Sequence, residues 1–166
     1  MHRALASLRG RVPSWDSISQ DPARLRRVIN LWPPHAAAGI RVTMIAADWS
    51  RVESELRLRP WTANYVGTQF GGSLFSMTDP WWMIMLLNRL GKGYIVWDKA
   101  AEIDFVAPGR GTVRAVFSLP DSVVEEVREQ ASDGKTVLRW FEVSVLDADG
   151  TLVSRVRKQV YIRRKP

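Results

Sequence analysis

The sequence predicts an α+β domain in which an antiparallel β-sheet wraps against one central, apolar helix. The helix is indicated by an apolar stretch that begins near Gly72 and ends around Leu90, before a glycine-rich turn. Segments in which apolar and polar residues alternate come before this stretch and follow it in succession. That order of elements favours an antiparallel sheet with the helix on one face. The length of 166 residues suits one domain with a core of its own.

The first predicted element is an amphipathic helix over residues 21–32, whose apolar residues fall on one side. The Pro33-Pro34 pair predicts its end, because proline cannot continue a helix from within. We expect residues 1–39 to form an N-terminal helical extension and residues 40–166 to form the main domain.

The predicted strands lie on both sides of the central helix. Residues 40–46 form the first, and residues 53–59 form the second, where charged residues alternate with Ser54, Leu56 and Leu58. After the helix, strands are predicted over residues 94–106, 112–119, 136–146 and 152–162. Residues 147–151 predict a hairpin turn between the last two. Residues 120–131 fit either a short helix or an elaborated loop.

The composition limits the chemistry that the chain supports. It contains no cysteine, which excludes disulfides, thiol catalysis and sulfur-ligated metals. Its two histidines, His2 and His35, lie outside any cluster of acidic residues. We therefore expect no metal site and no histidine base beside the functional motif.

The formal net charge of +7 allows three explanations. Cations on the outward face of the last strand are typical of a solvated strand edge. They also suit a polyphosphate ligand such as coenzyme A or, as a third alternative, nucleic acid. No zinc, RNA-binding or helix-turn-helix pattern is present, so we expect no nucleic-acid partner. Most of the excess lies near the two ends, in Arg3, Arg9, Arg11, Arg24, Arg26 and Arg27, and in Arg155, Arg157, Lys158, Arg163, Arg164 and Lys165.

Neither a secretory signal nor a membrane span is predicted. The first dozen residues lack the apolar core of a signal peptide. The longest apolar run, residues 80–87, is far too short to cross a bilayer. We expect a cytoplasmic protein.

The most informative motif is NYVGTQFGGSLFSMTD, residues 64–79. Gly71 and Gly72 at a helix start leave backbone N–H groups able to point at a developing negative charge. Asp79 follows in an apolar segment with Phe75, Met77, Trp82 and Met83, where a carboxylate has little water. An oxyanion-binding turn followed by such an acid predicts an acyl-transfer or hydrolysis site.

This motif resembles the signature of the hotdog-fold acyl-CoA thioesterases, especially the phenylacetate-pathway type. Residues 101–109, AEIDFVAPG, resemble the strand of the same family that ends in a Pro-Gly turn. The chain as a whole is similar to a bacterial branch of that superfamily known as a domain of unknown function. The resemblance spans roughly residues 40–163 and implies a hotdog fold.

The resemblance also implies a reaction and a set of residues for it. The reaction is hydrolysis of an acyl-CoA or acyl carrier thioester, with Asp79 as general base or nucleophile and no cofactor beyond the coenzyme A of the substrate. The Gly71 or Gly72 N–H would hold the carbonyl oxygen, and Asn64 would lie near the thioester. Since relatives pair two sheets edge to edge with sites at the boundary, we expect a homodimer or a dimer of dimers. The predicted substrate contacts are Thr68, Phe70, Trp82, Met83 and Arg110.

Phe70 departs from the family pattern, because many relatives have histidine before the glycine pair. A phenylalanine side chain neither donates a hydrogen bond nor titrates, so the role of that histidine is missing here. This departure supports a second hypothesis, a non-catalytic acyl-binding or lipid-binding hotdog module.

Each site residue also has a structural alternative. Asp79 before Pro80 is suited to cap a helix that begins at Pro80; otherwise the helix begins near Gly72 and is kinked at Pro80. The glycine pair could serve close approach of helix and sheet, and Asn64 could be a turn residue. The aromatic and methionine residues after Pro80 suit a core or a dimer interface as well as an acyl pocket.

Overall fold

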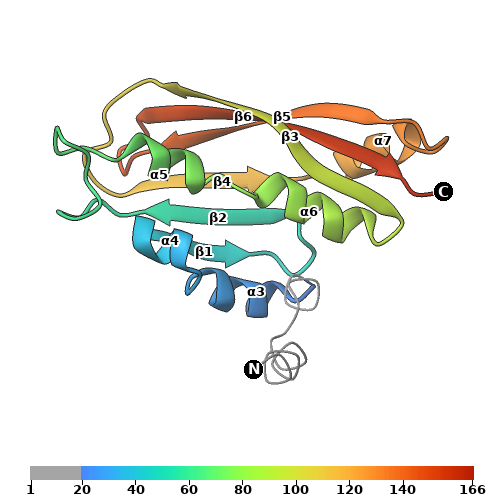
Figure 1. Cartoon of the computed structure of the whole chain (residues 1–166), viewed down its shortest axis with the longest axis horizontal. Helices are drawn as coiled ribbons and strands as arrows, with labels where there is room; N and C mark the ends of the chain where they lie inside the picture. The colour runs from blue at the N-terminus through green and yellow to red at the C-terminus, as the bar shows by residue number, and fades with distance from the viewer. Residues whose placement is uncertain (1–19) are drawn as a thin grey trace, which may run out of the picture.

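The computed structural model describes residues 20–166 as one antiparallel sheet with helices against it (Figure 1). The sheet has six strands in the order β1-β2-β4-β5-β6-β3, and each neighbouring pair is antiparallel. The strands are β1 (Ile40–Ile45), β2 (Arg51–Leu56), β3 (Tyr94–Phe105), β4 (Val113–Ser118), β5 (Val137–Leu146) and β6 (Leu152–Arg164). The helices are α3 (Pro22–Ile29), α4 (Pro33–Ala38), α5 (Gly71–Ser76), α6 (Trp81–Leu90) and α7 (Asp121–Gln130).

The predicted strands are confirmed, with the largest shift at β2. This strand begins at Arg51 and ends at Leu56, whereas the alternation of charges predicted residues 53–59. The chain leaves the sheet after Leu56 because the Thr62 and Ala63 N–H groups turn back to bond the Arg59 carbonyl, both at 3.0 Å. The segment that could be helix or loop is helix α7.

The predicted helix over residues 21–32 is α3, which is shorter and already ends at Ile29. The Pro33-Pro34 pair, predicted to end that helix, instead begins a second helix, α4. Proline is accepted at the first helical position, where no N–H is needed. Residues 1–19 of the predicted extension, with Arg3, Arg9 and Arg11, lie outside the described part of the chain.

The helix α3 is attached to the sheet at the β1 edge. Leu25 and Ile29 on α3 are 0% and 2% exposed and belong to the core. Asn30, which follows α3, donates to the Val42 carbonyl at 3.0 Å and accepts from the Val42 N–H at 2.7 Å. This paired contact holds the helix against the first strand.

The central helical segment is α5 followed by α6, separated by residues 77–80, and both lie across one face of the sheet (Figure 1). Pro80 has no N–H for the helical bond to Ser76, so the helix is interrupted. The Met77 carbonyl left at this break accepts from the Ser54 hydroxyl at 3.0 Å and from Trp81 Nε1 at 3.1 Å. The first part of the break, Met77, is therefore hydrogen-bonded and buried.

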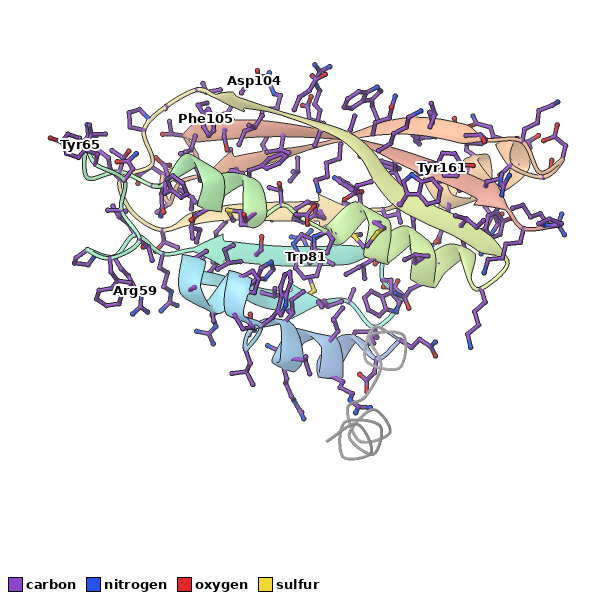
Figure 2. The ribbon with its side chains drawn as sticks, in the orientation of Figure 1. Arg59, Tyr65, Trp81, Asp104, Phe105 and Tyr161 are labelled. Carbon is purple, nitrogen blue, oxygen red and sulfur yellow. The ribbon has the colours of Figure 1, made fainter. Side chains whose placement is uncertain are left out.

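The core lies between these helices and the sheet. Trp81 is fully buried there (Figure 2), and Trp82 stacks on Phe141 with ring centroids 4.8 Å apart. The Phe117 ring meets both tryptophans, at 6.5 Å from Trp81 and 5.5 Å from Trp82. Among the described helices, none combines the length and apolar character needed to cross a membrane.

Candidate functional site

A cleft of about 360 Å³ opens at the start of α5. Its walls come from the residue 64–79 motif and from the segment that follows β3, and they include Asn64, Thr68, Gly71, Leu74 and Phe105. Figure 2 shows Phe105 above the start of α5, and Tyr65 at the same end of the molecule. The two sequence motifs that carried the family resemblance therefore meet at one cleft.

Gln69 holds the two motifs together. Its backbone N–H donates to the Gly109 carbonyl at 2.9 Å. Its side-chain Nε2 donates to the carbonyls of Leu56 and Gly111, at 3.0 and 2.7 Å. Gln69 is 3% exposed, so these bonds are shielded from water. The sequence analysis did not single out Gln69, since its role depends on partners that are distant along the chain.

Gly71 and Gly72 are the first two residues of α5, as predicted. The N–H groups of Ser73 and Leu74 bond the Phe70 carbonyl, whereas those of Gly71 and Gly72 have no acceptor within residues 20–166. A Cβ at Gly71 would lie 2.9 Å from the Phe105 ring, and one at Gly72 would lie 2.5 Å from the Phe70 ring. Both alternatives for the pair, open donors and close packing, thus have a structural basis.

Asn64 organises the turn that leads into the cleft. Its Oδ1 accepts from the N–H groups of Val66 and Thr68, at 3.1 and 3.0 Å. Its Nδ2 donates to Thr68 Oγ1 at 2.8 Å and to the Gln69 carbonyl at 3.2 Å. The side chain therefore serves the turn role that the sequence equally allowed, and it also lines the cleft.

Asp79 lies in the break between α5 and α6, where its carboxylate pairs with the Lys158 ammonium. It does not cap α6, because the N-cap residue is Pro80 and no side-chain capping bond is made. The Asp79 side chain is 52% exposed in the single chain, so the expectation of a poorly hydrated carboxylate is wrong for the isolated subunit. The interruption at Pro80 turns the carboxylate toward β6 instead of into the core.

Lys158 is the residue that the sequence analysis missed. Its side chain is only 3% exposed, although its neighbours along β6 include the exposed cations Arg155 and Arg157. The alternation along β6 contains the signal, since Lys158 shares its phase with the buried Val156 and Val160. The ammonium also lies 5.8 Å from the centroid of the Phe75 ring on α5.

Asp98 on β3 is the second carboxylate on this ammonium, at 2.9 Å from Lys158 Nζ through Oδ2. The register against β6 shifts between Asp98 and Ala100, which leaves Lys99 as an extra residue. Because opposed residues share a face, Asp98 opposite Val160 faces the helices, and so does Ile103 opposite Val156. Without the extra residue, a period of two would not place both side chains on that face.

Burial raises the pKa of Asp98 above its ordinary value; the Lys158 ammonium opposes this rise, and the Asp79 carboxylate adds to it. The second oxygen, Asp98 Oδ1, is buried without a hydrogen-bond partner in the described chain. On the other side of Asp79, burial lowers the pKa of His35, against an opposing effect from Asp79. His35 is 2% exposed and has the rings of Trp32 and Trp81 as neighbours.

The remaining predicted contacts are spread over different environments. Thr68 is buried and lines the cleft, and Phe70 is 55% exposed beside it. Trp82 is 4% exposed and stacked in the core, where the sequence also allowed it to lie. Met83 is partly buried against the same core, and Arg110 is exposed in the turn after Gly109.

The two ends of α5 lie apart within one chain. Asp79 lies eight positions after Gly71 and three positions beyond the end of α5, and this six-residue helix alone is roughly 9 Å long at 1.5 Å per residue. The open N–H groups and the carboxylate therefore do not meet on one carbonyl group within a single subunit. Within residues 20–166, no group of three or more histidine or acidic side chains is placed to hold a metal ion.

Solved structures of other proteins have the same architecture. The probable thioesterase PA5026 of Pseudomonas aeruginosa superposes with a TM-score of 0.76 at 16% identity, over 87% of this chain and 97% of that one. Thioesterase HI1161 of Haemophilus influenzae gives 0.62 at 12% identity, over 86% and 90%. The PaaI protein of the Escherichia coli phenylacetic acid degradation operon gives 0.55 at 16% identity, over 86% and 91%.

These likenesses confirm the predicted hotdog fold, the architecture of known thioesterases. Within that class, residues 23–162 match the model of the domain of unknown function DUF4442, and the chain belongs to this family. No curated protein matches the sequence.

Proposed function

We propose that the protein hydrolyses acyl thioesters, with Asp79 acting on the attacking water. The observation that carries this proposal is the position of Asp79, a half-exposed carboxylate held by a buried ammonium at the break in the central helix. A fixed, ionised carboxylate that is open to substrate is what a general base requires. The thioesterase-like fold of the relatives makes a thioester the expected substrate class.

The proposed carbonyl-binding group is the open N–H of Gly71 or Gly72. Donors aimed at the developing oxyanion stabilise the transition state of acyl transfer. The acyl group would enter the cleft beside Leu74 and Phe105, both of which line it. This places the acyl group differently from the tryptophan and methionine wall expected from the sequence.

The separation of Gly71 and Asp79 leads us to propose that the working unit is a homodimer. Within residues 20–166, the strand β3 pairs only with β6, and its other edge has no strand partner there. Two copies joined at this edge would bring Asp79 of one subunit toward Gly71 of the partner subunit. An open edge of this kind is normally covered or paired.

In the proposed reaction, a water oxygen bonds to the acyl carbon while Asp79 takes its proton. The C–S bond then breaks, and the leaving sulfur receives a proton to give the free thiol. Every atom comes from water and the thioester, so the proposed reaction needs no metal and no redox cofactor. Coenzyme A enters only as part of the substrate.

The test is thiol release from acetyl-, hexanoyl-, palmitoyl- and phenylacetyl-CoA by the full chain, together with its mass in solution. Turnover of at least one thioester by a dimer or tetramer supports the proposal. A folded dimer that binds these thioesters without turnover would replace it with the acyl-binding module. Phe70 in place of the family's histidine is the observation that favours that second function.

A further inference from the structure

We propose that Asp98 and Lys158 belong to the hydrolytic site: Lys158 positions Asp79, and Asp98 shares with Asp79 the proton taken from water. This inference rests on the proposed thioester hydrolysis and assigns the proton-handling groups within it. It gives a role in proton transfer to Asp98, a partly buried carboxylate, and to the buried ammonium that binds both acids.

The charges of the three side chains do not balance. Two carboxylates bind one ammonium whose side chain is 3% exposed. With all three groups ionised the cluster carries one negative charge in excess, since one cation faces two anions. Uptake of a single proton therefore neutralises it, and the attack of water releases one such proton.

The two carboxylates differ in exposure to solvent. Asp79 is half-exposed and meets the substrate, whereas the Asp98 side chain is 21% exposed and lies behind it. Asp98 Oδ1 has no hydrogen-bond partner within the described residues, so it has an oxygen available for a proton. Burial already favours the protonated form of Asp98 by raising its pKa.

The fold holds these three side chains in place. Lys158 stands on β6, which is bonded to β5 on one side and to β3 on the other. Asp98 lies opposite the buried Val160 in the β3–β6 register, and Phe75 covers the ammonium from α5. A surface ion pair would need none of these devices.

The groups that face the cluster come from four elements. They are Asp79 at the break, Lys158 from β6, Asp98 from β3 and His35 from α4. Burial lowers the pKa of His35, so it contributes no charge near neutral pH. The charged groups that face the cluster are therefore the two carboxylates and the ammonium.

The proton moves in a balanced sequence. A water O–H bond breaks as the oxygen bonds to the acyl carbon, and the proton passes to the Asp79–Asp98 pair. When the C–S bond breaks, the electron pair stays on sulfur. The pair of carboxylates then returns the proton to the sulfur, and the cluster regains its single negative charge.

The test is the pH dependence of kcat/KM for the best acyl-CoA substrate, followed by loss of thioester absorbance. In Asp98→Asn, the negative charge beside Asp79 is gone and Lys158 remains. The acid limb should move to lower pH by about one unit or more. The kcat should fall about tenfold, because the weaker base receives no help with the proton.

Lys158→Met should move the acid limb in the opposite direction, to higher pH, because two carboxylates remain without their cation. Since this variant leaves Asp98 buried and unpaired, the double variant Lys158→Met with Asp98→Asn is measured beside it. The double variant lacks both the Lys158 ammonium and the Asp98 carboxylate, so the acid limb of its kcat/KM profile should lie between those of the two single variants.

Asp104→Asn is the matched control, because Asp104 is an exposed carboxylate on the same strand and faces away from the cluster. It should keep the wild-type profile. An active wild type whose acid limb is unchanged in Asp98→Asn and in the double variant overturns this inference alone. A wild type that hydrolyses none of the thioesters overturns the proposed function, and this inference with it.

Discussion

The two ends of α5 differ in how their chemistry is built. At the first end, Gly71 and Gly72 offer backbone donors beside an open, mainly apolar cleft. At the other end, Asp79 joins Lys158, and all of the chemistry lies in charged side chains. The backbone donors at the first end are neighbours in sequence, whereas Asp79 and Lys158 at the second are 79 residues apart. A local motif can thus mark where a site begins without revealing the groups that complete it.

Removal of the Asp79 charge is expected to have the largest effect. Asp79→Asn keeps the shape of the side chain and should lower kcat/KM at least about 100-fold, the scale for loss of a general base. Thiol release from the same acyl-CoA measures it, with the thermal midpoint as a check on folding. A loss of kcat/KM smaller than about tenfold in a folded variant would mean that Asp79 is not the general base.

Removal of the Gln69 side chain should separate the two motifs at the cleft end. Gln69→Leu leaves buried carbonyls of Leu56 and Gly111 without their donor, which should cost about 2 kcal/mol of unfolding free energy. Urea unfolding measures the change. Gln130→Ala, which removes an exposed bond to Glu126 on α7, is the control and should stay within about 0.5 kcal/mol.

A methyl group at the start of α5 should partly close the cleft. Gly71→Ala pushes the Phe105 ring aside, since the new Cβ would lie 2.9 Å from it. We expect about a tenfold loss of kcat/KM, which corresponds to about 1.4 kcal/mol. Gly93→Ala is the matched control, because a Cβ there meets nothing within 4 Å. Equal kcat/KM values for both alanine variants would mean that the substrate does not bind in this cleft.

The smallest expected effect is on how stability depends on pH, through His35, which lies near Asp79. The pKa of His35 is lowered in the folded protein, so the unfolded chain takes up a proton more readily as the pH falls. The stability that neutral His35 provides is present above about pH 6.5 and is lost as the pH falls through its folded pKa. In His35→Gln, the free energy of unfolding should therefore change less between pH 7.5 and pH 5 than it does in the wild type, as measured by urea unfolding at each pH. The same dependence in variant and wild type would contradict this assignment.

The sequence predicted the fold well because its signals are local. Alternation marked the strands, and the glycine pair marked the start of α5 to within one residue of the predicted Gly72. The same rules predicted a kink at Pro80 but not that the helix already ends at Ser76, since a proline predicts an interruption without fixing its length. They also gave Pro33 only the role of a stop, although it begins α4.

The charged end was only partly accessible from the sequence. Asp79 was found because it follows the motif, and the phase of Lys158 among Val156 and Val160 was visible but was counted as surface charge. The shared face of Asp98 and Ile103 could not be predicted, because it depends on the extra residue Lys99 between them. No glycine or proline marks that irregularity, and only pairing with β6 reveals it.

The extra residue in β3 has a consequence for how this strand tolerates changes in length. Deletion of Lys99 would keep Asp98 in place but turn Ile103 and Phe105 to the opposite face of the sheet, away from α5. Insertion of one further residue would have the same effect. Only changes by two residues preserve both the carboxylate and the cleft wall, so segments exchanged between this chain and its relatives must match in parity as well as in sequence.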